Sequence, residues 1–174
     1  MKILVAWDDA KEAELLGLYL STGENEATVC ADAAAVLAQA REHNWDALLM
    51  SLTFPKAAEE GFALFKRFQE VAPGVTVVLA CRQTETMDLV RFMTNGLRFY
   101  LIRDDRADFI FLVLSTVESA VNADRAEEAR KLAQQLREEM DGVRRLQESI
   151  IPRGINPPPG YQIAARYEPS QISV

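Results

Sequence analysis

Between residues 2 and 102 the sequence repeats one unit, a short apolar run followed by a longer stretch with apolar residues at helical spacing. The first run is KILVA at residues 2–6, and the helical pattern at residues 11–20 follows it. Runs this short, apolar and without polar alternation are typical of strands buried on both faces of a parallel sheet. The sequence therefore predicts a single doubly wound α/β domain with a five-stranded parallel sheet. The remaining expected strands are 27–31, 46–50, 76–80 and 98–102, and the remaining expected helices are 33–43, 61–71 and 88–96, the last ended by Gly96.

The composition allows a globular core and restricts the partners. Hydrophobic residues make up 49% of the chain, charged residues 26%, and the net charge is −7, without a basic stripe that would attract nucleic acid. No apolar run reaches the ~18–20 residues of a membrane span, and the N-terminus lacks a signal-peptide pattern, so we expect a cytoplasmic protein. Cys30 and Cys81 lie inside apolar runs, which predicts buried free thiols in a reducing compartment. We expect a protein partner, no cofactor and no bound metal.

After residue 103 the pattern changes to one long helix. Asp105 is the predicted N-cap, with Asp108 in the first turn, and no proline interrupts the sequence from there to Ile150. Beyond Asn122 the helix is charged, with a narrow apolar stripe near heptad spacing. Two interpretations stay open, a disordered linker or a helix that pairs with a second copy, and we favour a parallel homodimer. The stripe consists of Ala129 followed by the predicted dimer residues Leu132, Leu136, Met140, Val143, Leu146 and Ile150.

Ligands of doubly wound sheets bind at the carboxyl ends of the strands, so the residues at those ends are the candidate site. In this sequence they are Trp7, Asp8, Asp9, Ser51, Ala80 and Arg103. The segments ILVAWDD, DALLMSLTFP, LAC and GLRFYLIRD carry them, and over residues 1 to about 120 the chain resembles the response-regulator receiver family. This resemblance implies a flavodoxin-like receiver fold, here followed by an extended C-terminal helix.

The resemblance also implies that the chemistry of phosphate transfer has been lost. Ser51 stands in place of the phospho-acceptor Asp, Trp7 in place of an acid, Ala80 in place of a hydroxyl residue and Arg103 in place of the family's Lys. A phosphoryl acceptor and a Mg²⁺ site both need carboxylates.

Only Asp8 and the adjacent Asp9 keep the acidic character of the site. We therefore expect a vestigial pocket in which Arg103 pairs with Asp8 or a neighbouring acid; phosphorylation of Ser51 itself is the alternative. Tyr100 matches the family's switch aromatic, and with Phe92 of the preceding helix it forms the expected docking face.

The last residues resemble a different family. LQESIIP and GYQIAARYEPSQISV are similar to the entry of a PPM-type, SpoIIE-like serine phosphatase domain. The resemblance implies domains at 1–122 (receiver-like), 123–150 (helical linker, coiled coil) and 151–174 (Pro-rich linker and first strand of a downstream domain). It places the metal-binding acids beyond this sequence, so no catalytic residue is assigned and the chain by itself is not expected to be an enzyme.

Three functional hypotheses follow. The first is a non-phosphorylatable pseudo-receiver that controls a downstream phosphatase through protein interaction and dimerisation. The second is a free-standing adaptor or scaffold protein. The third is a phosphorylated receiver of a two-component system, and a mass shift after acetyl phosphate treatment separates it from the others.

Overall fold

The computed structural model describes residues 1–150, and residues 1–102 contain the predicted parallel sheet. Five parallel strands lie in the order β2-β1-β3-β4-β5. Each short apolar run forms one strand, and β3 is buried along its whole length because helices cover both faces of the sheet. The strands are β1 (Lys2–Ala6), β2 (Glu26–Cys30), β3 (Ala47–Ser51), β4 (Thr76–Cys81) and β5 (Phe99–Ile102).

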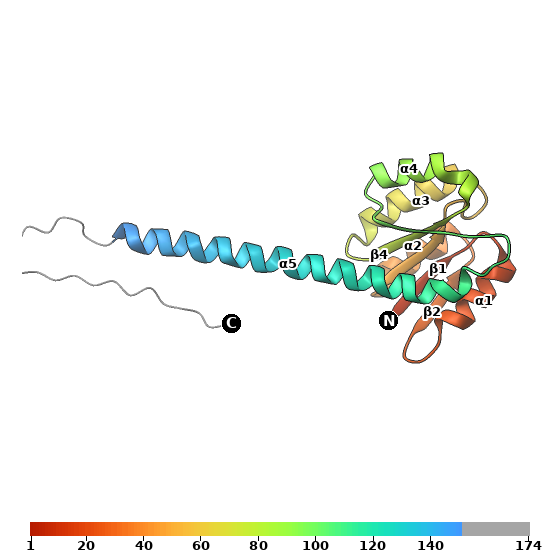
Figure 1. Ribbon diagram of the computed structural model, residues 1–174, viewed down its shortest axis with the longest axis horizontal. Helices are drawn as coiled ribbons and strands as arrows, with labels where there is room; N and C mark the ends of the chain where they lie inside the picture. The colour runs from red at the N-terminus through yellow and green to blue at the C-terminus, as the bar shows by residue number, and fades with distance from the viewer. Residues whose placement is uncertain (151–174) are drawn as a thin grey trace, which may run out of the picture. The chain divides into compact units, whose positions relative to one another are not determined.

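Helices cover the two faces of this sheet, so that each face has its own apolar core. Figure 1 shows α3 and α4 on one side of the sheet and α1 with the first part of α5 on the other. The core under α1 and α5 includes Leu16 and Val113, and the core under α2, α3 and α4 includes Phe65 and Phe92. The helices are α1 (Ala10–Leu20), α2 (Ala33–Glu42), α3 (Ala58–Val71), α4 (Thr86–Thr94, after the 3₁₀ turn Gln83–Glu85) and α5 (Ile110–Ile150).

Local sequence signals begin and end these helices. The Asp9 carboxylate accepts hydrogen bonds from the backbone N–H groups of Lys11 and Glu12, which makes Asp9 the N-cap of α1. Gly96 follows α4 with a φ of 102°, a conformation that favours glycine and that ends the helix as predicted. Gly61 in α3 is required for a different reason, because an added Cβ would lie 1.9 Å from the carbonyl oxygen of Leu52.

The start of α5 differs from the prediction. The expected N-cap at Asp105 is wrong, because α5 begins at Ile110. Ala107 has a φ of 58°, which a continuous right-handed helix cannot accommodate, and the Asp104 carboxylate accepts a hydrogen bond from the Asp108 N–H in the preceding turn.

The chain divides into two compact units. The first comprises Met1–Arg125, and the second begins at Ala126. Cys30 and Cys81 are free and buried, as predicted. The predicted linker and strand of residues 151–174 lie outside the described residues.

Candidate functional site

Ser51, the residue predicted to stand at the acceptor position, is the last residue of β3 and is fully buried. It pairs with Ala80 on β4, another of the predicted site residues. The Ser51 hydroxyl accepts a hydrogen bond from the backbone N–H of Asp8, with 3.1 Å between the two heavy atoms. Ser51 thus connects the ends of β3 and β1, and its oxygen is inaccessible to a phosphate donor.

Arg103 leaves the end of β5 and bridges two carboxylates. One guanidinium nitrogen lies 2.7 Å from Asp8 Oδ1, and the other lies 2.6 Å from Glu12 Oε2. The Arg103 side chain is 4% exposed, so both pairs are shielded from solvent. The predicted pairing of Arg103 with Asp8 is confirmed.

Trp7 completes the surroundings of Arg103. Its indole N–H donates to Glu12 Oε2 at 2.7 Å, and the Arg103 guanidinium carbon lies 4.5 Å from the centre of the Trp7 ring. The ring also stacks on Phe109, with 5.7 Å between the ring centres. The guanidinium is therefore held by carboxylates along its edge and by an aromatic face.

The second oxygen of Asp8 is also occupied. The Thr53 hydroxyl donates to Asp8 Oδ2, and Arg82 Nη1 lies 3.7 Å from the same oxygen. Arg82 is held in turn by Glu85, whose carboxylate accepts from both the backbone N–H and the guanidinium of Arg82. Both Asp8 oxygens are engaged within the chain.

Sequence reasoning missed Glu12, Thr53, Arg82 and Glu85. Arg82 directly follows β4 and Thr53 follows β3 by two residues, so their positions beside strand ends could have identified these two. Glu12 lies in the first turn of α1, and the sequence prediction considered only residues at the carboxyl ends of the strands.

These contacts determine the charge state of Asp8. Burial by itself raises the pKa of Asp8, but hydrogen bonds from Thr53 and Arg103 and the positive charges of Arg103 and Arg82 outweigh it. The net effect holds the pKa of Asp8 below its ordinary value. Asp8 is therefore a carboxylate at neutral pH.

The donor set does not fit Mg²⁺, the metal that the fold family implies. Mg²⁺ in proteins is bound through carboxylate oxygens with octahedral geometry. Here the Asp8 oxygens face two arginines and a hydroxyl, Asp9 caps α1, and Ser51 is neutral. Among residues 1–150, no three His, Cys, Asp or Glu side chains form a group that could hold a metal ion.

Solved structures with the same architecture identify the fold. A CheY-like response regulator receiver domain protein from Methanospirillum hungatei is 17% identical, with a TM-score of 0.63, over 72% of this chain and 97% of that chain. The receiver domain of the Francisella response regulator 1452 is 20% identical, with a TM-score of 0.59, over 70% of this chain and 97% of that chain. The chain has the receiver fold.

Part of a longer protein has a similar structure as well. NtrX from Brucella abortus is 19% identical, with a TM-score of 0.65, over 82% of this chain but only 34% of its own. The receiver-fold chain thus spans about a third of that protein. No protein-family model and no curated protein matches the sequence.

None of the helices in residues 1–150 combines the length and apolarity needed to cross a membrane.

The predicted docking face of the receiver-fold domain needs one correction. Phe92 is 1% exposed because it packs against Phe62 and Phe65 of α3, so it belongs to the core and not to a docking surface. Tyr100 is 46% exposed. The neighbouring strand positions Phe99 and Leu101 pack toward the core under α5, so Tyr100 points to the opposite side of the sheet.

The apolar stripe of α5 is exposed along the described part of the second unit. Its five large side chains are between 41% and 63% exposed. The side chain of the sixth predicted residue, Ile150, lies outside the described ones. The exposed residues are Leu132, Leu136, Met140, Val143 and Leu146.

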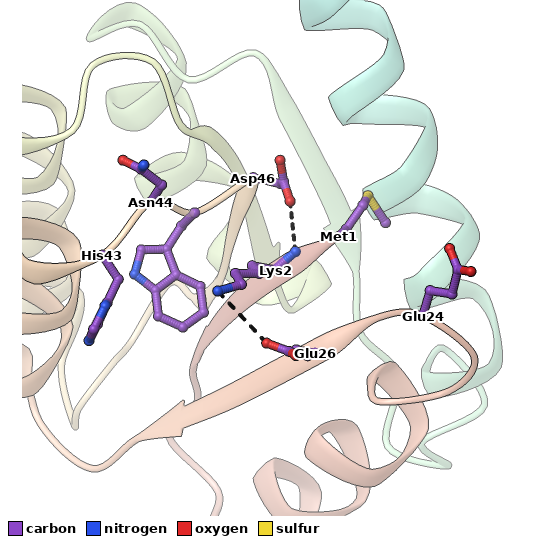
Figure 2. A pocket seen from close by; sticks show the side chains of 8 residues that line it. Met1, Lys2, Glu24, Glu26, His43, Asn44 and Asp46 are labelled. Carbon is purple, nitrogen blue, oxygen red and sulfur yellow. Dashed lines mark hydrogen bonds and ion pairs between the residues drawn. The ribbon is translucent and has the colours of Figure 1, made fainter.

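A hollow of about 520 Å³ lies at the amino ends of the strands, opposite the strand-end pocket. It is lined by the start of β1 and by residues before β3. Figure 2 shows Lys2 between two acids: its backbone N–H donates to Asp46, and its ammonium lies 4.0 Å from Glu26. Asp46 is further paired with Arg125 at 2.8 Å. The charges of Lys2, Glu26 and Asp46 are thus paired within the chain.

Proposed function

We propose that this chain is a signalling module whose receiver-fold domain works without phosphorylation. In this proposal the domain binds a protein partner, α5 dimerises, and the two together control a downstream phosphatase domain. The main support is the strand-end pocket, in which Arg103 forms ion pairs with both Asp8 and Glu12. Ser51, at the predicted acceptor position, is buried.

The pocket is held together by the chain's own charges. In a receiver, an added phosphoryl group would supply the negative charge that the conserved Lys binds. Here Asp8 and Glu12 already supply negative charge to Arg103, so the Arg103 guanidinium is not free to bind a phosphoryl group. We infer that the domain stays in one conformation, and that partner binding replaces phosphate as its input.

A partner surface is available on the side of α4 and β5. Met87 and Val90 of α4 are 84% and 54% exposed, and Tyr100 and Ile102 of β5, an edge strand of the sheet, are also exposed. A group of large apolar side chains in water is typical of a protein-binding surface. The same surface supports the second candidate function, a free-standing adaptor without a phosphatase.

Treatment of the purified chain with acetyl phosphate and Mg²⁺, followed by intact-mass measurement, tests the proposal. We expect no added phosphoryl group, because Ser51 is buried and Asp8 has no free oxygen. A receiver domain with an intact acceptor Asp, treated in parallel, shows that the reagents are active.

Two variants make the measurement specific. If the wild-type chain gains a phosphoryl group and Ser51→Ala does not, Ser51 is an acceptor and the proposal is wrong. If Ser51→Ala is labelled as well, another residue is modified, and peptide mapping locates it. Labelling at Asp8 or Asp9 would also contradict a phosphorylation-independent domain.

A further inference from the structure

An apolar groove lies between α1 and the start of α5. Its volume is about 550 Å³, and it lies wholly within the first unit. Leu18 and Phe111, on its two sides, are each 69% exposed. The lining also includes Leu15, Tyr19, Thr22, Arg106, Ala107 and Ile110.

The domain itself does not need these outward side chains. α1 already buries Ala13, Leu16 and Leu20 in the core. Leu15 and Leu18 lie on the other side of the same helix, where a solvent-facing helix normally carries polar residues. An apolar groove between two helices, with leucines on one wall and a phenylalanine on the other, is a surface for another protein.

We infer that a second copy of this chain covers the groove with the same surface, in a parallel dimer. The inference rests on the proposed pairing of α5 and extends it. Phe111 precedes Leu132 by 21 residues and Leu146 by 35, which are three and five heptads. In a two-stranded coil, residues seven apart stay in phase, so pairing through Leu132 and Leu146 directs Phe111 of both copies to the same seam.

The heptad positions between them are compatible with this arrangement. Ser115, Glu118, Asn122 and Arg125 continue the phase, and all are exposed. Their polarity indicates that the seam is loosely packed there, and that the apolar contacts lie at its two ends. The contact at the Phe111 end is the groove.

Charge also favours a like surface over other partners. The exposed charges near the groove residues in the chain have both signs, so opposite charges can pair across a contact between two copies. Nucleic acid or an anionic membrane would require a predominantly basic surface, and the chain carries a net charge of −7. The charged residues are Lys11, Glu14, Arg106, Asp108 and Glu118.

Pairing of α5 makes even a small second contact effective. Once the stripes are joined, the two grooves meet at a local concentration on the order of millimolar. The groove therefore does not need to dimerise the domain alone. It needs only to add affinity to the coil.

Sedimentation equilibrium of the full chain tests the inference. We expect Leu18→Glu and Phe111→Glu each to weaken dimerisation at least about tenfold, because each removes a buried apolar contact from both copies. Ala63→Glu, at an exposed position of α3 on the opposite side of the sheet, is the matched control and should leave the dissociation constant unchanged. Equal urea midpoints of all three variants show that the domain is folded.

Cross-linking gives an independent positive result. Phe111→Cys should form a disulfide-linked dimer under mild oxidation, and Ala63→Cys on α3 should not. Cys30 and Cys81 are buried, so the native cysteines should not form the cross-link. If Leu18→Glu and Phe111→Glu dimerise like the wild type while Leu136→Asp is monomeric, the groove inference is overturned and the coil stands. If the wild type is monomeric at ~100 μM, both the coil and the groove contact are wrong, while the phosphorylation test above is unaffected.

Discussion

The strand-end pocket and the second half of α5 use their side chains in opposite ways. In the pocket, the charges of Asp8, Glu12 and Arg103 are paired within the domain, and no buried side-chain nitrogen or oxygen in the described part of the chain lacks a hydrogen-bond partner. Along α5 beyond Ala126, large apolar side chains remain between 41% and 63% exposed. The charges of the pocket are paired within one copy of the chain, whereas the apolar stripe of the helix is exposed.

Because of this difference, substitutions in the two regions should have different effects. Substitutions in the pocket should lower the stability of the folded domain, because they leave a charge or a polar group without its partner. Substitutions in the stripe should leave the fold intact and lower the affinity between copies. The following predictions test that separation.

The largest effect is expected for Leu136→Asp. Removing one buried leucine from each copy should weaken the dimer by roughly 3–6 kcal/mol, twice the contribution of about 1.5–3 kcal/mol per side chain. Analytical ultracentrifugation of the full chain should then show a monomer at ~100 μM. Gln135→Asp, one residue away and outside the stripe, is the control, and an equal loss of dimer there would exclude a specific seam.

Arg103→Met should destabilise the domain by about 3–5 kcal/mol, because Asp8 and Glu12 lose their shared cation in a buried site. Urea unfolding followed by circular dichroism measures the change. Lys2→Met breaks an exposed pair with Glu26 and should cost less than about 1 kcal/mol. Similar losses in both variants would show that the Arg103 pairs are not shielded.

Ser51→Ala should cost about 1–3 kcal/mol, since the buried N–H of Asp8 loses its acceptor. The control is Ser115→Ala, whose hydroxyl bonds the exposed start of α5 and which should change stability by less than about 0.5 kcal/mol. Urea midpoints of the two variants give the comparison. A neutral Ser51→Ala would mean that water or another group replaces the hydroxyl.

The smallest effect on the free energy of unfolding is expected when the pH is lowered. The pKa of Asp8 is lower in the folded domain than its ordinary value of 3.8, so its contribution is fully present above that value and is lost as the pH falls through the folded-state pKa. The free energy of unfolding should therefore decrease below about pH 4 more steeply for the wild type than for Asp8→Asn. Parallel curves for the two proteins would show that Asp8 is not stabilised as a carboxylate.

The sequence by itself determined the sheet and its covering helices. Each strand is a short apolar run and each helix a periodic pattern, and both signals are local in the chain. The pairing of Arg103 with Asp8 was also predictable, because parallel strands place their carboxyl ends at one edge and opposite charges meet there. The end of α4 at Gly96 followed from one residue type.

Only the tertiary structure decided the rest. Phe92 looked like a surface residue until α3 and α4 packed around it, and Asp105 looked like a helix cap until the turn at Ala107 delayed α5 to Ile110. Glu12 joined the pocket because the side chain of Arg103, which follows β5, reaches the first turn of α1, and the two residues are 91 positions apart. Such contacts depend on where whole elements pack, and a pattern of neighbouring residues carries no information about that.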